Sequence, residues 1–303
     1  MAEVVYSLRI PAVHPANPAN IERFVVRAEE LGFHAVWAGD HVFYHSDVLQ
    51  PLHLLTWLAA KTSRVRLGQA VMLSAYLNPV LLARAAATID VLSGGRFTLG
   101  MSIGGTEAEF NSIGVPMNQR VGRLLETIEI MRRLWREDGV EFKGRYHQIE
   151  GGSINPKPVQ PGGVPVYMGA FGDAMLKRIA RHADGWVGGS QPIAGFLANV
   201  PKLRSYAQAI GRDPDSLAIA KLQNVSIGAT REQARLQGEA HWRAYYNPIY
   251  DLDTASIYGT AAECAEQLQV FAAMDDPRIE LALEPAGLSI EHLEALASIT
   301  TQA

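Results

Sequence analysis

Short apolar segments alternate with helical patterns along nearly the whole chain, and this alternation restricts the fold more than any other feature of the sequence. Such alternation is typical of parallel sheets, and eight strand–helix units in 303 residues fit a closed (β/α)₈ TIM barrel, an α/β fold, better than an open sheet. The predicted strands cover residues 4–10, 34–39, 65–72, 96–103, 164–169, 184–188, 217–227 and 278–284. The predicted helices cover residues 19–31, 51–61, 79–92, 119–137, 173–182, 193–210, 230–244, 260–274 and 289–298.

Two stretches interrupt this rhythm inside what we expect to be a single domain over residues 1–303. Residues 138–163 are rich in Gly and Pro, and Phe142 and Tyr146 flank a turn within them. We expect a short hairpin followed by a loop, inserted after the fourth helix. Residues 245–259 are irregular and aromatic, so they are a candidate lid over the site.

The composition argues against nucleic acids and membranes as binding partners. The formal net charge is −4 and charged residues make up 19% of the chain, so no basic patch for nucleic acid is expected. Arg84 and Asp90 interrupt the longest apolar run, so no membrane span is expected. Cys264 is the only cysteine and the sequence lacks a signal-peptide pattern, which together predict a cytoplasmic protein without an internal disulfide. A small-molecule substrate is the partner we expect.

The predicted strand 34–39 runs directly into an aspartate and a histidine, Asp40 and His41. In a barrel of parallel strands the carboxyl ends of the strands carry the chemistry. His41 would exchange a proton with a substrate, because the ordinary pKa of imidazole lies near neutral pH, and Asp40 would orient the ring or contact a cofactor. The alternative is that Asp40 caps a turn while His41 packs at the strand end. The position after Gly39 at a strand end favours the functional interpretation.

Small residues follow three further strands. The strand 96–103 ends in the small residues 102–105, which leave space for a flat ligand. The loop 169–172 opens a helix, where free N–H groups attract phosphate and glycine allows close approach. Asp173 competes with this interpretation, because as an N-cap it would occupy the same amides. Residues 188–190 offer a second small-residue rim for the same anion.

Other candidate groups have weaker patterns. His41, His45 and Asp47 raise the question of a metal site, but the surrounding Gly, Ser and Pro indicate a loop, where four-residue spacing has no special meaning, and we predict no metal. Cys264 is interpreted as a small core residue rather than a nucleophile. Two sets of residues stay open between structural and ligand-binding roles: Arg120 and Arg123, and the aromatic run Trp242, Tyr245, Tyr246 and Tyr250.

In their order and spacing these motifs resemble the bacterial-luciferase-like flavin-dependent oxidoreductases, most of all the short single-component branch that uses the deazaflavin coenzyme F420. The similarity covers nearly the whole chain, and each motif is modest alone. The matching stretches are residues 28–33 (AEELGF), 37–41 (WAGDH), 65–68 (VRLG), 78–79 (NP), 90–96 (DVLSGGR), 109–110 (EF), 120–126, 134–135 (LW), 183–186 (ADGW) and 259–260 (GT).

The resemblance implies a cofactor at the carboxyl face of the barrel, with its ring across the ends of strands one to four. It implies a non-proline cis peptide bond at Ala70–Val71 behind the ring, His41 as the catalytic histidine with Asp40 beside it, and the tail phosphate at residues 169–172 and 188–190. The predicted cofactor contacts are Asp40, Ala70, Val71, Met72, Ser102, Gly104, Gly169, Ala170, Phe171, Gly172, Gly188, Gly189 and Ser190.

The chain departs from the sugar-phosphate dehydrogenase branch of that family. Gly105 stands where that branch has a glutamate proton partner, although Glu107 and Glu109 lie close by, and the phosphate-binding lysines have no clear equivalents. We therefore expect hydride transfer between coenzyme F420 and a neutral alcohol, ketone or enone rather than a phosphosugar.

Three alternatives stay open. One is a monooxygenase that uses FMN supplied by a separate reductase, and a second is a flavin-binding homologue without activity. A metal-dependent barrel hydrolase would show a His-x-His pair at the end of the first strand, where this chain has residues 10–12 (IPA). A homodimer is expected from the resemblance, through the helices after strands two and three, whose small apolar residues are Leu54, Leu58, Ala59, Ala83, Ala86 and Ala87.

Overall fold

Eight parallel strands close into a barrel in the computed structural model, which describes residues 1–74, 77–246 and 251–300. The strands follow the order β9–β11–β1–β2–β3–β4–β7–β8, and β8 pairs back with β9. The predicted (β/α)₈ barrel is therefore confirmed. The barrel strands are β1 (Glu3–Arg9), β2 (Ala35–Ala38), β3 (Arg66–Leu73), β4 (Phe97–Ser102), β7 (Val166–Gly169), β8 (Gly185–Gly188), β9 (Ala218–Ile227) and β11 (Arg278–Pro285).

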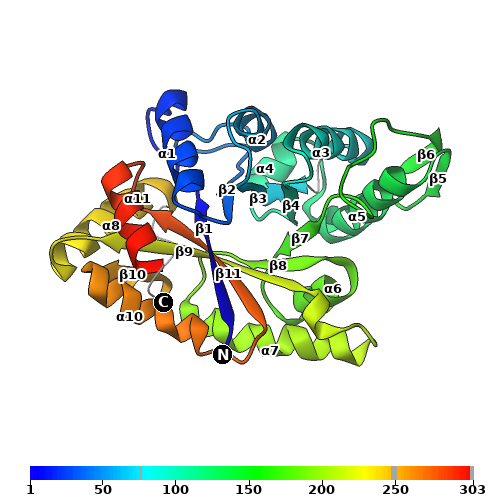
Figure 1. Cartoon of the computed structure of the whole chain (residues 1–303). Helices are drawn as coiled ribbons and strands as arrows, with labels where there is room; N and C mark the ends of the chain where they lie inside the picture. The colour runs from blue at the N-terminus through cyan, green and yellow to red at the C-terminus, as the bar shows by residue number, and fades with distance from the viewer. Residues whose placement is uncertain (75–76, 247–250, 301–303) are drawn as a thin grey trace.

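The helices surround these strands (Figure 1). Every predicted helix occurs, and each begins and ends within two residues of its expected position. The short helices α4 (Glu107–Ser112) and α9 (Leu252–Ala255) were not expected. The surrounding helices are α1 (Pro18–Glu30), α2 (Pro51–Ala59), α3 (Pro79–Ser93), α5 (Arg120–Arg136), α6 (Asp173–His182), α7 (Ile193–Ala209), α8 (Arg231–Tyr246), α10 (Ala261–Ala272) and α11 (Ile290–Thr300).

The alternation of side chains along each strand divides the core into two parts. One set of buried residues packs between the strands and the helices, and a smaller set fills the barrel interior. Trp37 is the largest buried interior residue, and an added Cβ at Gly68 on the neighbouring strand would lie 2.2 Å from its ring. The interior residues are Ala35, Trp37, Ala70, Val187, Leu222 and Ala282, with Val71 and Tyr167 packed against them.

The residues expected on a dimer face are instead buried inside the single chain. Leu58 and Ala83 are fully buried, and all six belong to the core between strands and helices. The reason is that α2 packs on both α3 and β3, so the small apolar residues serve packing within the barrel. That part of the prediction is wrong, and Leu81 and Leu92 are the large apolar residues that α3 exposes most. The six residues are Leu54, Leu58, Ala59, Ala83, Ala86 and Ala87.

The predicted hairpin occurs as β5 (Val140–Lys143) and β6 (Gln148–Gly152), an antiparallel pair beside α5 (Figure 1). The Glu126 carboxylate accepts three backbone N–H bonds from its turn, at 2.7 Å from Arg145, 3.0 Å from Tyr146 and 3.1 Å from His147. One side chain of α5 therefore holds the whole turn.

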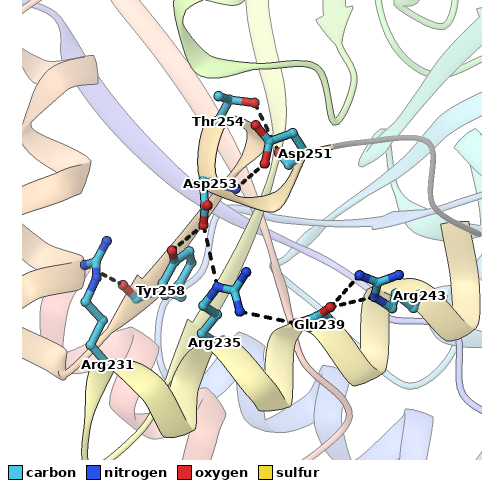
Figure 2. Close-up of polar contacts among 8 residues, drawn as sticks. All are labelled: Arg231, Arg235, Glu239, Arg243, Asp251, Asp253, Thr254 and Tyr258. Atoms are coloured by element: carbon cyan, nitrogen blue, oxygen red, sulfur yellow. Dashed lines mark hydrogen bonds and ion pairs between the residues drawn. The ribbon is translucent and has the colours of Figure 1, made fainter.

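The stretch predicted as a lid at 245–259 has regular structure where it is described. Residues 247–250 lie outside the described residues, whereas α9 and β10 (Ser256–Gly259) follow them, and β10 pairs with the second half of β9. Figure 2 shows how Asp253 on α9 meets α8 and β10: it accepts a 2.5 Å bond from the Tyr258 hydroxyl and lies 3.7 Å from Arg235. Residues 256–259 are buried and extend the sheet, and a lid role for the rest of the stretch stays a prediction.

Within the described ranges, no helix combines the length and the apolar character that crossing a membrane requires.

Asp90 on α3 fastens the loop that follows the hairpin. Its fully buried carboxylate accepts bonds from Val159 N (2.8 Å), Gln160 N (3.1 Å) and the Gln160 side chain (2.6 Å).

Asp90→Ala should lower the free energy of unfolding by about 2–4 kcal/mol in urea titrations, because it removes the acceptor of these N–H groups. Thr88→Ala, at an exposed position of the same helix, should change it by less than about 0.5 kcal/mol. Equal effects of the two variants would contradict the role of Asp90.

Candidate active site

A cavity of about 500 Å³ opens at the carboxyl ends of β3, β4, β7, β8 and β9. It has the position that a barrel enzyme uses for chemistry and the size of a small-molecule site. Its lining is mostly small or apolar. The predicted cofactor contacts found in that lining are Val71, Ser102, Gly104, Gly169, Ala170, Phe171, Gly189 and Ser190, and the remaining lining residues are Leu73, Ile103, Gly105, Met175, Val187 and Leu222.

At the floor of the cavity, around Val71, two glycines allow close packing that a side chain would prevent. An added Cβ at Gly169 would lie 2.8 Å from Val71 Cγ1, and one at Gly100 would lie 2.1 Å from the Gln69 carbonyl oxygen. The Ala70–Val71 peptide bond is cis, which confirms the expectation from the resemblance. The floor therefore suits a flat ligand that lies on Val71.

The other predicted contacts are placed differently. Ala70 is buried in the barrel interior, and Met72 packs in the core between strands and helices. Gly188 also faces outward, since an added Cβ there would lie 2.5 Å from the Phe196 ring of α7. Because neighbouring positions of a strand point to opposite faces, the side chain of Met72 and the side-chain face of Gly188 are directed away from the cavity, a correction to the predicted set.

The N-terminus of α6 lies beside the cavity. Gly172 is its N-cap, with φ +81°, and no side chain caps the helix. Asp173 is the first helical residue, and its exposed carboxylate lies 3.7 Å from the Lys202 ammonium. The interpretation of Asp173 as N-cap is therefore wrong, and the first-turn amides keep their capacity to bind an anion.

Asp40 links the ends of β2 and β3. Its half-buried carboxylate accepts a 3.1 Å bond from the backbone N–H of Leu73, a residue of the cavity lining. Burial raises the pKa of Asp40, the Leu73 bond opposes this rise, and the negative charge of Glu109 adds to it. Glu109 is itself buried on α4 and accepts from the N–H groups of Val42 (3.3 Å) and Phe43 (3.4 Å). The two carboxylates thus hold the loop that carries His41.

His41 lies on this loop next to Asp40, outside the residues that line the cavity itself. Its ring stacks on Tyr44 with centroids 3.7 Å apart and meets the edge of Tyr245 at 5.7 Å. Burial lowers the pKa of His41 to about 4, and the positive charges of Arg9 and His45 act in the same direction. Near neutral pH the imidazole is therefore uncharged and able to accept a proton.

A buried polar group beside His41 was missed by the sequence analysis. The Arg9 guanidinium donates to the Tyr245 hydroxyl (3.0 Å) and forms an ion pair with Glu284. Gly39 is small for the same reason, since an added Cβ would lie 2.8 Å from Arg9 Nη2. The sequence did contain an indication of this pair, namely one charged residue near the carboxyl end of each of the strands β1 and β11. These two strands are neighbours in the barrel.

The remaining sequence candidates lie apart from the cavity lining. His45 contacts the Ala244 carbonyl (2.8 Å) and Asp47 pairs with His14, so neither faces His41 as a metal partner. No three His, Cys, Asp or Glu side chains of the described ranges are placed to hold a metal ion. Burial raises the pKa of Cys264 to about 12, as expected for an inert core residue.

The two open sets have partly structural roles. Arg123 donates to Gln119 (3.0 Å) and lies over the Tyr146 ring of the hairpin, away from the cavity. Trp242 is buried. The Tyr246 side chain and Tyr250 fall outside the described residues, so the prediction for them is untested. For Arg120 the structural and the ligand-binding role both stay open.

Comparison with known proteins identifies relatives along the chain. The model of a family described as luciferase-like monooxygenase matches residues 5–289. An F420-dependent glucose-6-phosphate dehydrogenase of Kineococcus radiotolerans is 35% identical over 205 residues, which cover 64% of this chain and 60% of that protein. A 5,10-methylenetetrahydromethanopterin reductase of Archaeoglobus fulgidus is 30% identical over 215 residues, which cover 71% of this chain and 62% of that protein. The match therefore spans less than two thirds of the length of these relatives.

Solved structures show the same fold at lower identity. A monooxygenase from Streptomyces bottropensis has a TM-score of 0.85 at 22% identity and covers 98% of this chain and 99% of its own. An F420-dependent secondary alcohol dehydrogenase in complex with an F420–acetone adduct has a TM-score of 0.84 at 19% identity, with 98% of both chains covered. Such low identity demonstrates a shared fold alone.

The buried surroundings of His41 predict an unusually low pKa for this side chain. In NMR titrations of the folded chain the His41 ring should stay neutral down to about pH 5 and protonate near pH 4, because burial disfavours its charged form. In the urea-unfolded chain it should titrate near ~6.5, the ordinary value. Protonation of His41 at the same pH in both states would contradict the burial argument.

Proposed function

The chain belongs to the luciferase-like monooxygenase family, and on that basis we propose that it is an oxidoreductase that transfers a hydride between coenzyme F420 and a small neutral alcohol, ketone or enone. The observation that carries the proposal is the glycine-lined cavity at the barrel mouth, whose lining residue Leu73 is bonded to Asp40, the neighbour of His41 in the chain. The relative from Kineococcus radiotolerans, which is named as F420-dependent, supports the choice of coenzyme.

The residues present fit a flat ring with an anionic tail. Val71 and the glycines around it would support the ring, and Ser102 and Gly104 would border it. The uncapped N-terminus of α6 and the loop at Gly189–Ser190 would hold the tail phosphate, because backbone N–H groups at a helix start attract anions. A bound deazaflavin supplies the hydride chemistry.

His41 then manages the proton. Because its pKa is about 4, it is uncharged near neutral pH and able to accept the hydroxyl proton of an alcohol. Supplying a proton to a ketone would need the imidazolium, which is scarce at that pH. By microscopic reversibility the same ring would serve both directions, so its protonation state sets the pH dependence of the reaction and not its direction.

The lining argues for a neutral substrate. Among the described residues that line it there is no Lys or Arg, the side chains that a phosphosugar needs. Phe171 belongs to the lining and exposes 48% of its surface. An exposed aromatic ring in the lining suits an apolar substrate.

The second candidate is an FMN-dependent monooxygenase that receives reduced flavin from a separate reductase. The description of the matching family and the monooxygenase from Streptomyces bottropensis favour it. Binding of FMN in place of the deazaflavin would use the same cavity.

Titration with both tricyclic cofactors distinguishes the two candidates. Coenzyme F420 should bind more tightly than FMN, as followed by quenching of its fluorescence. Gly169→Ala should weaken binding about ten-fold or more, since its Cβ would displace Val71 at a cost of about 1–3 kcal/mol. Gly195→Ala on α7 lies outside the cavity lining, and its added Cβ would make only an ordinary 3.8 Å contact with Gln191 Oε1, so this variant should bind as the wild type does. Tight FMN binding with weak F420 binding would support the monooxygenase instead.

Removal of the histidine tests the proton transfer. His41→Ala should reduce turnover of a secondary alcohol about 10²–10⁴-fold, the usual contribution of a general base. In the wild type, kcat/KM should fall as the pH drops through about 4, because the base must be unprotonated. His53→Ala, at an exposed position on α2, serves as the control. Full activity of His41→Ala would refute the role.

A further inference from the structure

Lys221 on β9 is a fully buried lysine behind the loop that follows β8. Its ammonium group donates to three backbone carbonyl oxygens, those of Gly189 (3.3 Å), Gln191 (3.1 Å) and Leu222 (3.3 Å). Gly189 belongs to the cavity lining, as does Ser190 between the two loop acceptors. Lys221 thus fixes from behind the loop whose front borders the cavity.

No carboxylate of the part of the chain that the structure describes pairs with the charge of Lys221. The Phe196 ring of α7 lies 5.6 Å from Nζ, the loop contributes the uncharged Ser190 and Gln191, and β8 contributes Gly188. No described carboxylate or second cation affects it, and burial alone lowers its pKa to about 7. A buried cation without a counter-charge is unfavourable, so an anion bound nearby would stabilise it.

The charge of Lys221 decides how many N–H groups its side chain can donate, and so how firmly it holds the loop. An ammonium group has three donors, which match the three carbonyl acceptors, whereas a neutral amine has two. Deprotonation would therefore leave one buried carbonyl without its bond and release the loop at Gly189 or Gln191 from Lys221.

We propose that Lys221 is a positioning residue for the anionic tail of the cofactor, fixing the 189–191 loop and supplying from behind it the positive charge that favours a phosphodiester on the cavity side. Lys221 does not line the cavity, so it acts through the loop and not by touching the ligand. The inference rests on the proposed function, since it needs a tricyclic cofactor with a charged tail in that cavity.

The sign of the pH dependence follows from linkage. A bound anion raises the pKa of Lys221, so binding takes up a proton where the lysine is partly neutral. Affinity for the tailed cofactor should therefore fall as the pH rises through about 7. A ligand with the same ring and no anionic tail should not show this loss.

The experiment compares coenzyme F420 with its ribityl fragment FO, which has the same ring and lacks the phosphodiester tail. The ratio of their dissociation constants, measured from pH 6 to 9 by fluorescence quenching, cancels effects on the ring. In the wild type the preference for F420 should fall about ten-fold over this range, the effect of one pKa unit of coupling. Lys221→Met should show the weaker preference at every pH.

Two control variants separate charge from packing. Lys221→Arg keeps a cation that stays protonated, so it should retain a preference for F420 that does not change with pH. Lys61→Met removes an exposed lysine from the turn after α2 and should behave as the wild type does.

The outcomes distinguish the two levels of the argument. A wild-type ratio that is independent of pH, or an unchanged ratio in Lys221→Met, would overturn the role of Lys221 while leaving F420 binding intact. Failure of F420, FO and FMN alike to bind would overturn the proposed function and this inference with it. If Lys221→Met does not fold, calorimetry of the wild type in two buffers at pH 8 decides: proton uptake with F420 and none with FO is expected.

Discussion

The backbone pairing of β8 with β9 closes the sheet, and the arrangement of the site depends on that closure. Without it, Gly189 and Ser190 would lie at a sheet edge instead of opposite Val71 across one rim. The pairing occupies only the first half of β9, and β10 takes the second half on the far side from β11. One long strand thus joins the barrel to the segment after α8 and also places Lys221 behind the cavity loop.

The periodicity of the sequence was sufficient for the fold, because strand and helix periods differ and each strand–helix unit carries both. The periodicity missed strand β10, because its four residues contain too few alternations to reveal a strand. The family resemblance placed Met72 at the cavity. The register of β3 against β4 shifts between Gln69 and Met72, so the direction of that side chain could not be read from the sequence.

The site was predictable where function follows from position in a single strand. Asp40 and His41 come directly after β2, and the small residues come directly after β4, β7 and β8. Arg9 and Glu284 were missed, and the role of Tyr245 was left open, because their contacts join residues far apart along the chain and no local pattern encodes such contacts. Lys221 was missed for the same reason, although it is the one charged residue of a long buried strand.

The hairpin insertion is attached by side chains that do not belong to it. Glu126 on α5 binds the backbone of its turn, and Asp90 on α3 binds the backbone of the loop that returns to β7. Apart from the Gln160 side chain, the groups that these two carboxylates bind are main-chain N–H groups, which every residue except proline carries. Most side chains of the turn and the loop could therefore change without removing the bonds that hold the insertion on the barrel.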